Sequence, residues 1–194
     1  MSERGSYAKG VAKREEILRT ALEVFSREGY RGTSLREVAR ESGLSLPGLM
    51  HYFNSKEDLL AEILKKRDER DEATYRQHDN PLAALAAVMR HNAEVPGLVQ
   101  LYATLSAAAS DPGHPAHDFF VERYTYFRTQ FAEDILRRQA EGTLPASLDP
   151  DKLAASMIAL ADGIQVQWML DPTIDMGDHI EFLWSTLTAQ VSAN

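Results

Sequence analysis

Apolar residues recur along this chain at intervals of three and four, the spacing that places them on one face of an α-helix. The first clear stripe joins Ile17, Leu18, Ala21, Leu22 and Phe25. No run alternates apolar and polar residues for long enough to indicate a β-strand. The pattern therefore predicts an all-α protein of about nine helices, separated by turns rich in proline and glycine.

Capping residues place the boundaries of the early helices. Gly29 is expected to end the first helix, because glycine accepts the left-handed conformation found at helix ends. Ser34, with a glutamate three residues later, forms a capping box that starts a short second helix, which Gly43 closes. A third helix is expected from Ser45, and a fourth from Ser55. The charged run that follows, residues 65–76, is interpreted as a solvated face of a helix that spans from one domain to another.

Two apolar stripes stand out near the C-terminus, one around residues 153–168 and one around 180–191. Each could simply be core. Two adjacent helices are also suitable for a seam between two copies of the chain, in which each copy contributes two helices. The residues predicted for such a dimer interface are Leu153, Met157, Leu160, Ile164, Leu183, Trp184, Leu187 and Val191.

The composition is that of a packed protein, with 44% apolar and 26% charged residues in 194. The absence of cysteine excludes disulfides, thiolate metal sites and cysteine nucleophiles. No apolar stretch reaches the ~18 residues typical of a membrane span, and the polar N-terminus does not resemble a signal peptide. We therefore expect a soluble cytoplasmic protein with no membrane partner.

Charge divides unevenly along the chain. Residues 1–56 carry ten basic and seven acidic side chains, a net of +3, whereas the remaining residues carry a net of −11. A basic N-terminal quarter joined to an acidic body suggests two separate tasks on one chain. Scattered surface charge is the alternative interpretation, since +3 is a modest excess.

Three short motifs follow one another between residues 25 and 60: FSREGYRGT (25–33), SLREVARESGLS (34–45) and HYFNSKEDLL (51–60). A helix, a tight turn and a second helix that projects outward form a DNA-binding arrangement. In this order and spacing, the motifs resemble those of the tetracycline-repressor (TetR) family of bacterial transcription regulators. The resemblance covers about the first sixty residues.

The resemblance implies a helix-turn-helix DNA-binding domain at residues 1–56 and a helical ligand-binding and dimerisation domain at residues 57–194. It implies a homodimeric repressor that binds a near-palindromic operator in double-stranded DNA and is released by a small effector. No enzymatic activity and no cofactor are expected. The third helix is expected to enter the major groove, with the residues at its start nearest the bases.

The DNA contacts that the resemblance implies fall around the second and third helices. Hydroxyl groups and the helix dipole favour phosphate at the start of the second helix, Arg36 can reach a base edge or a phosphate, and Lys56 corresponds to a phosphate-clamping lysine. Family members often carry Thr or Ala where Gly48 stands, and Tyr where Met50 stands. The backbone, thymine methyl groups and Arg36 are therefore expected to carry more of the specificity. The predicted contacts are Thr33, Ser34, Arg36, Ser45, Leu46, Gly48, His51, Tyr52 and Lys56.

The acidic body contains small residues beside aromatic ones, a combination that favours a ligand cavity with an apolar wall and a few polar groups. The same aromatic residues could instead fill the core. An apolar or aromatic effector is the prediction, and its candidate contacts are Met89, His91, Tyr102, Phe120, Tyr124, Phe127 and Trp168.

Two other functions are alternatives to this one. His114 and His117, with Asp118 beside them, have a spacing that could bind zinc or nickel in a metal-responsive regulator, although a solvated surface cluster is the simpler interpretation. A small helical enzyme is the other alternative. It has no sequence support, because the chain contains neither a phosphate-binding loop nor a hydrolase or metalloprotease motif. We therefore predict no metal site and no catalytic residues.

Overall fold

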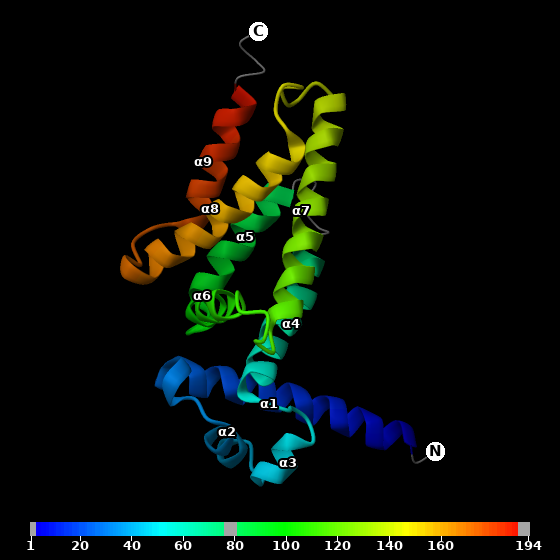
Figure 1. Cartoon of the computed structure of the whole chain (residues 1–194), viewed down its shortest axis with the longest axis vertical. Coiled ribbons are helices and arrows are strands. Elements are labelled where there is room, and N and C mark those ends of the chain that lie inside the picture. Colours follow the sequence, from blue (N-terminus) through cyan, green and yellow to red (C-terminus); the bar gives the residue numbers. More distant parts are fainter. Residues whose placement is uncertain (1–2, 76–80, 190–194) are drawn as a thin grey trace. The chain divides into compact units, whose positions relative to one another are not determined.

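The computed structural model describes residues 3–75 and 81–189. Within these ranges all regular structure is helical, as predicted, and it forms nine helices (Figure 1). They are α1 (Glu3–Gly32), α2 (Leu35–Glu41), α3 (Leu46–Met50), α4 (Lys56–Tyr75), α5 (Pro81–Glu94), α6 (Leu98–Ala108), α7 (His117–Ala140), α8 (Pro150–Leu170) and α9 (Met176–Ala189).

The helices group by contact into two compact units. The first unit contains the chain up to Glu69 together with Val95–His117, and the second contains Arg70–Glu94 and the chain from Asp118 onward. The boundary thus lies within α4, and α6 belongs to the first unit. The grouping reflects packing, so the division of function at residue 56 stays a prediction.

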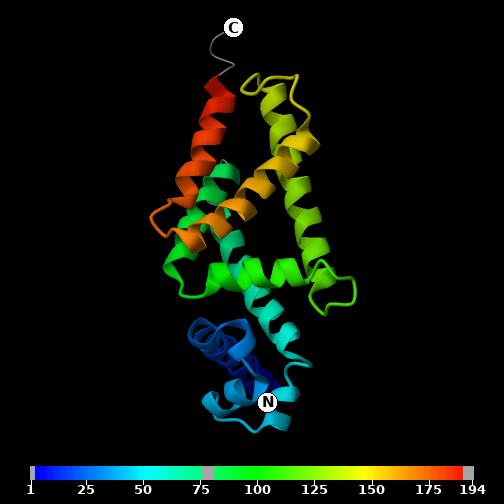
Figure 2. The same cartoon turned by 60° about the vertical axis from the view of Figure 1, so that its left-hand side comes forward.

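The first unit is built on the apolar stripe of α1. Ile17, Ala21 and Phe25 are fully buried, and α2 and α6 both pack against α1. α3 packs in turn on α2, and the views in Figures 1 and 2 agree that these short helices lie side by side. Leu49 of α3 and Phe53 just after it complete this core.

Serine side chains start α2, α3 and α4, as the sequence predicted. The Oγ atoms of Ser34, Ser45 and Ser55 each accept a hydrogen bond from the backbone N–H three residues further on, at 3.3, 3.2 and 3.0 Å. These bonds satisfy amides that have no partner within the helix. In the expected capping box at Ser34, the carboxylate of Glu37 accepts hydrogen bonds from Arg40.

Two glycines reverse the chain where the sequence predicted helix ends. Gly29 has φ 67° and interrupts the helical conformation of α1, which continues only to Gly32. Gly43 has φ 66° and lets the amide of Leu44 return to the carbonyl of Ala39 at 2.8 Å. Left-handed backbone of this kind strains any residue with a Cβ atom, so these turns depend on glycine.

The second unit is held together by the packing of α5 on α9, with α8 also against α9 (Figure 2). Gly177 of α9 allows the close approach, since a Cβ atom there would lie 2.8 Å from the carbonyl oxygen of Ala86. Arg90 of α5 forms ion pairs with Glu181 at 2.8 Å and with Asp175 at 3.2 Å. These bonds raise the pKa of Arg90 and help to lower those of both carboxylates.

Among the described residues, α8 alone is long and apolar enough to cross a membrane by length and composition. The expectation from uninterrupted apolar runs missed it, because the helix also carries polar residues such as Asp162 and Gln165. Core helices of soluble proteins pass the same test, and Met157 and Ile164 of α8 are buried inside the chain. The length of α8 is therefore weak support for a membrane span.

Candidate nucleic-acid interface

α2, the turn at residues 42–44 and α3 present one buried and one exposed face. Val38, Ala39 and Leu49 are at most 2% exposed and hold the pair against the rest of the first unit. The opposite side carries polar and apolar side chains into solvent. The exposed residues between positions 34 and 51 are Ser34, Arg36, Arg40, Glu41, Gly43, Ser45, Pro47, Met50 and His51.

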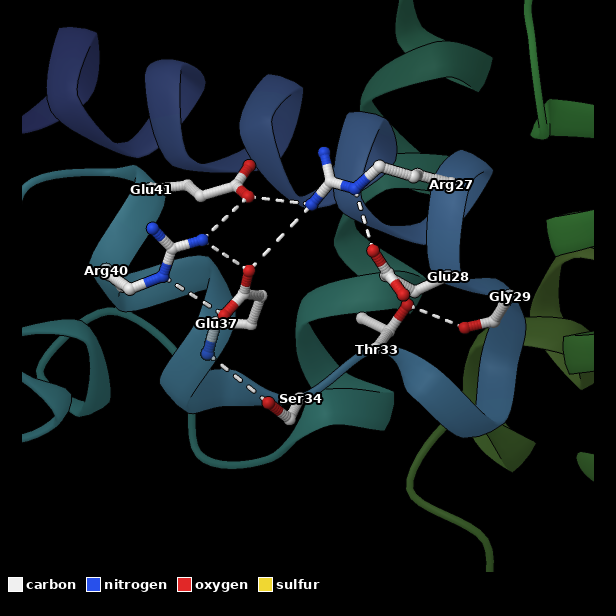
Figure 3. Close-up of polar contacts among 8 residues, drawn as sticks. All are labelled: Arg27, Glu28, Gly29, Thr33, Ser34, Glu37, Arg40 and Glu41. Atoms are coloured by element: carbon white, nitrogen blue, oxygen red, sulfur yellow. Dashed lines mark hydrogen bonds and ion pairs between the residues drawn. The ribbon is translucent and has the colours of Figure 1, made fainter.

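Charged side chains around α2 are mostly paired with one another (Figure 3). Arg40 binds Glu37 at 3.1 Å and Glu41 at 3.2 Å, and Arg27 of α1 binds Glu41 at 2.7 Å. The hydrogen bond with Arg40 holds the pKa of Glu37 below its usual value. Both guanidinium groups are thereby engaged within the protein.

Arg36 differs from these two arginines. It stands four positions before Arg40 on α2, is exposed, and has no hydrogen bond or ion pair within the part of the chain that the structure describes. A guanidinium group in water can offer its two parallel donors to a carboxylate, a phosphate or a guanine edge. Arg36 is therefore available to an external partner in a way that Arg27 and Arg40 are not.

Lys56 is partly engaged at the start of α4. Its Nζ donates a hydrogen bond to the carbonyl oxygen of Tyr30 at 2.9 Å and lies 4.1 Å from the centre of the Tyr30 ring. An ammonium group has three donors, so two remain for a phosphate. Burial, and then the neighbouring Glu57, raise the pKa of Tyr30, which donates its hydroxyl hydrogen to that carboxylate.

Thr33 departs from the expectation of a phosphate contact. Its side chain is 2% exposed, and its hydroxyl donates to the carbonyl oxygen of Gly29 at 2.8 Å. The residue therefore closes the end of α1, because a short hydroxyl so close to a free helical carbonyl binds it in preference to solvent. Ser34 beside it is exposed, with its oxygen committed to the cap of α2.

The remaining predicted contacts surround α3. Ser45 and His51 are exposed, whereas Leu46, Gly48 and Tyr52 are half-buried. The carbonyl oxygen of Tyr52 accepts a hydrogen bond from Arg14 at 2.8 Å, and the sequence did not indicate that contact.

Arg14 connects α1 to α4 as well as to the end of α3. It also binds Glu62 of α4 at 2.6 Å, and its guanidinium lies 4.4 Å from the centre of the Phe53 ring. The carboxylate stands 48 positions away along the chain, so no local spacing could have revealed the pair.

A short helix, a glycine turn and a second short helix with an exposed outer face define a helix-turn-helix DNA-binding head. Residues 17–63 match the family model for bacterial regulatory proteins of the tetR family, and residues 82–191 match that for the C-terminal part of BetI-type transcriptional repressors. The second match alone covers more than half of the chain. The protein belongs to the TetR family and is a DNA-binding transcriptional regulator, not an enzyme.

Individual relatives are similar to this protein, in sequence or in fold, along most of its chain. The transcriptional regulator PksA of Bacillus subtilis is 28% identical over an alignment of 183 positions, and this alignment covers 87% of this chain and 84% of PksA. A TetR regulator from Haloarcula marismortui has a similar fold, with a TM-score of 0.78 at 21% identity, covering 92% of this chain and 98% of that one. A candidate transcriptional regulator from Saccharomonospora viridis, crystallised with choline, has a TM-score of 0.66 at 25% identity and coverages of 86% and 90%.

The predicted ligand contacts differ in how deeply they are buried and in which of the two units they lie. Met89 and Phe120 are buried in the second unit, and Tyr124, Phe127 and Trp168 are half-buried there. The side chain of His91 is 62% exposed and lies 3.8 Å from Glu94. Tyr102 is buried in the first unit. His91 therefore departs from the expectation, because it points to solvent.

An aromatic row follows α7. The Phe119 and Phe120 rings are 5.0 Å apart, and Tyr124 follows at 6.2 Å from Phe120. The hydroxyl of Tyr124 donates to the carboxylate of Asp162 on α8 at 2.7 Å. The spacing predicted a common face for these rings, but it did not indicate the carboxylate that α8 brings to them.

Asn92 of α5 is a buried polar residue that the sequence analysis did not single out. It is 1% exposed, and neither its Oδ1 nor its Nδ2 has a hydrogen-bond partner among the residues that the structure describes. A helical wheel places it on the side of α5 opposite Ala86 and Arg90, which meet α9. A buried amide without a partner is costly, so it is expected to lower the stability of the ligand-free protein, and a polar group of a ligand can satisfy it.

The residues predicted for the dimer interface split into two groups. Met157 and Ile164 are at most 2% exposed within a single chain, so they belong to its core. The others in the described part are half-buried, and Val191 lies outside the described residues. The half-buried residues are Leu153, Leu160, Leu183, Trp184 and Leu187.

A different stripe of α8 is exposed. Its apolar members Val166 and Leu170 are 48% and 84% exposed, and Phe182 of α9 is 68% exposed. The exposed face of α8 also carries small residues at intervals of four, namely Ala155, Ala159 and Gly163. Both stripes of α8 are apolar in sequence, and only packing distinguishes the one that fills the core.

The two histidines of the metal alternative are engaged with backbone. Nδ1 of His114 accepts the amide of Ala116 at 3.1 Å, and Nδ1 of His117 lies 2.8 Å from the carbonyl oxygen of Ala109. The described residues contain no group of three or more candidate ligands placed to hold a metal ion.

Proposed function

We propose that this regulator is a homodimeric repressor that binds a near-palindromic operator through α2 and α3 and is released by a small effector bound in its C-terminal part. The observation that carries the DNA-binding mode is the exposed face of α2 and α3, where Arg36 has no protein partner among the described residues. In this mode α3 enters the major groove, Arg36 reads a base edge or binds a phosphate, and Lys56 binds the backbone.

The exposed apolar face of α8 and α9 supports dimerisation. Val166, Leu170 and Phe182 stand in solvent in a single chain. Clusters of large exposed apolar side chains mark interaction surfaces, and small residues along α8 permit two helices to approach closely. A second copy buries the same face by two-fold symmetry, which presents two heads to adjacent turns of the duplex, ~34 Å apart.

The second unit supports an effector that is largely apolar and carries a polar group. Aromatic rings of α7 provide apolar surface, and the amide of Asn92, which has no partner among the described residues, offers both a donor and an acceptor. The Saccharomonospora viridis relative was crystallised with choline, so this fold accommodates a small molecule in at least one relative. The effector releases DNA if it binds the DNA-incompetent arrangement of the dimer more tightly than the competent one.

In vitro selection of duplex DNA, followed by fluorescence anisotropy on the selected site, tests the proposal. We expect a near-palindrome, a complex of two chains per site, and affinity that falls steeply with added salt, as counterion release requires. Failure to retain any duplex at low salt would refute the DNA-binding mode. Selection of a single half-site bound by one chain would refute the homodimer and leave the DNA-binding mode standing.

A further inference from the structure

The solvent-facing surface of α3 is apolar at its centre. Met50 is 50% exposed although it is a large hydrophobic residue. Leu46 lies one helical turn earlier, on the same face, and is half-buried. Pro47, also exposed, adds a ring without a hydrogen-bond donor. The middle of the recognition helix therefore offers carbon and sulfur atoms to whatever it meets.

Polar groups are scarce along the same helix. α3 contains no charged residue, and the oxygen of Ser45 at its start already accepts the amide of Gly48. Gly48 contributes no side chain, and a Cβ atom there would lie 3.2 Å from that oxygen. The side chains of α3 thus include none of the amide and guanidinium groups that usually read base edges by paired hydrogen bonds.

The C5 methyl group of thymine is the one bulky apolar group on the base edges of the major groove. The groups that distinguish the other bases there are hydrogen-bond donors and acceptors, and covering one with a methionine leaves it unpaired. Methionine is flexible and polarisable, so it can follow the position of a methyl group on the groove wall.

We propose that Met50, supported by Leu46, reads the methyl group of a thymine in each half-site of the operator. The inference rests on the proposed function and assigns one determinant of its sequence preference. A protein partner is a weaker fit to this surface, because a stable protein interface needs roughly 800 Å² on each side, and α3 is a helix of five residues with the polar Ser45 and His51 at its two ends.

Replacement of thymine by deoxyuridine in the selected operator tests the inference, since this change removes the methyl group and leaves every hydrogen-bonding group in place. The full chain is titrated against duplexes with one such replacement at a time. For wild type we expect one thymine per half-site whose replacement weakens binding about fourfold, the value of burying one methyl group, and roughly fifteen-fold when both half-sites are changed.

The same titration with Met50→Ala tests whether Met50 is the residue that contacts the methyl group. We expect this variant to bind the thymine and deoxyuridine duplexes equally, whereas Met50→Leu keeps most of the preference. Met50 is half-exposed, so an unchanged thermal unfolding midpoint and unchanged affinity for random-sequence DNA should show that both variants fold. Val11→Ala, at an apolar residue of α1 that is 42% exposed, is the matched control and should keep the full preference.

Two results would overturn the assignment without affecting the proposed function. In one, wild type binds its operator but is insensitive to every methyl group. In the other, a methyl preference persists undiminished in Met50→Ala. If wild type binds no duplex at all, the proposed function itself fails, and this inference fails with it.

Discussion

The head of the first unit and the C-terminal helices of the second both leave apolar side chains in solvent, but in different surroundings. On α3, the exposed Met50 shares one short helix with Leu46 and Pro47, and Arg36 is exposed on the neighbouring helix. On α8 and α9, Leu170 and Phe182 are accompanied by Val166 and by small residues. A small apolar surface within a head that also exposes a guanidinium suits a DNA groove, whereas several large exposed apolar side chains on two packed helices suit a second protein surface.

The largest expected effect is on assembly. Leu170→Asp should weaken dimerisation more than about 100-fold, because the interface would then bury an unpaired charge. Operator binding should fall with it, as each chain would carry a single head. Sedimentation velocity measures the first effect and fluorescence anisotropy the second. Leu136→Asp, at an α7 residue that is 55% exposed, is the control and should remain dimeric. A dimeric Leu170→Asp variant would show that the apolar face has another role.

Packing in the second unit should be sensitive at Gly177. Gly177→Ala places a Cβ atom 2.8 Å from the carbonyl oxygen of Ala86 and equally close to Arg90, and should lower the free energy of unfolding by about 2 kcal/mol. Urea denaturation measures this change in the free energy of unfolding. Gly10→Ala in α1 meets nothing within 4 Å and should stabilise the helix slightly. Equal behaviour of the two variants would contradict the close packing of α5 on α9.

Two arginines of α2 provide a test within the head. Arg36→Ala should weaken binding to the selected operator about thirty-fold and relax its sequence preference, as loss of a base-reading arginine does. Arg40→Ala should have a much smaller effect, because its guanidinium is already bound by Glu37 and Glu41. Lys56→Ala should weaken binding to all sequences alike. Equal losses of specific and nonspecific binding for Arg36→Ala would remove it as a base reader.

Asn92→Leu should stabilise the ligand-free protein by about 1 kcal/mol, since it removes a buried amide that has no described partner. Gln165→Leu is the comparison, because Gln165 is as deeply buried but donates to the carbonyl oxygen of Ala161. Gln165→Leu should therefore stabilise the protein less than Asn92→Leu does. The thermal unfolding midpoints of the two variants measure this difference. A loss of stability in Asn92→Leu would mean that the amide is already satisfied, for example by internal water.

The smallest effect concerns pH. Hydrogen bonds from arginine lower the pKa of Glu37 in the head and of Glu181 in the second unit. A lowered folded-state pKa contributes stability above the unfolded value, about 4.3, and this contribution disappears as the pH falls through the folded-state pKa. The stability difference between wild type and Glu37→Gln, or Glu181→Gln, should therefore shrink below about pH 4 in urea titrations. A difference that grew on acidification would contradict these pairings.

Much of the head was predictable, because its signals are local. Serine caps, the glycine turn at Gly43 and the apolar positions Leu49 and Phe53 lie within a few residues of the structure that they determine. The pairing of Arg14 with Glu62, and the loss of the Thr33 hydroxyl to Gly29, were not predictable. Each contact depends on which of several available partners the side chain binds in the folded protein. The spacing of residues along the sequence does not show which partner that is.

The second unit was predictable only in outline. The stripe through Met157 and Ile164 was assigned to the dimer interface, and the structure buries both residues within one chain. The burial of Asn92 without a described partner had no signal at all. Apolar periodicity shows that a helix has a face to bury, and it does not show whether the partner is the same chain or another.

The sequence by itself determined the helical class, the starts and ends of the first helices, and the family, because propensity, capping and motif spacing are properties of short segments. Tertiary structure decided which arginine of α2 has no partner among the described residues, which apolar face of α8 remains in solvent and which polar groups are buried. Those outcomes arise because side chains from distant parts of the chain compete for the same partners and for the same space in the core. Which of them is paired or buried therefore depends on all the side chains that the fold brings together.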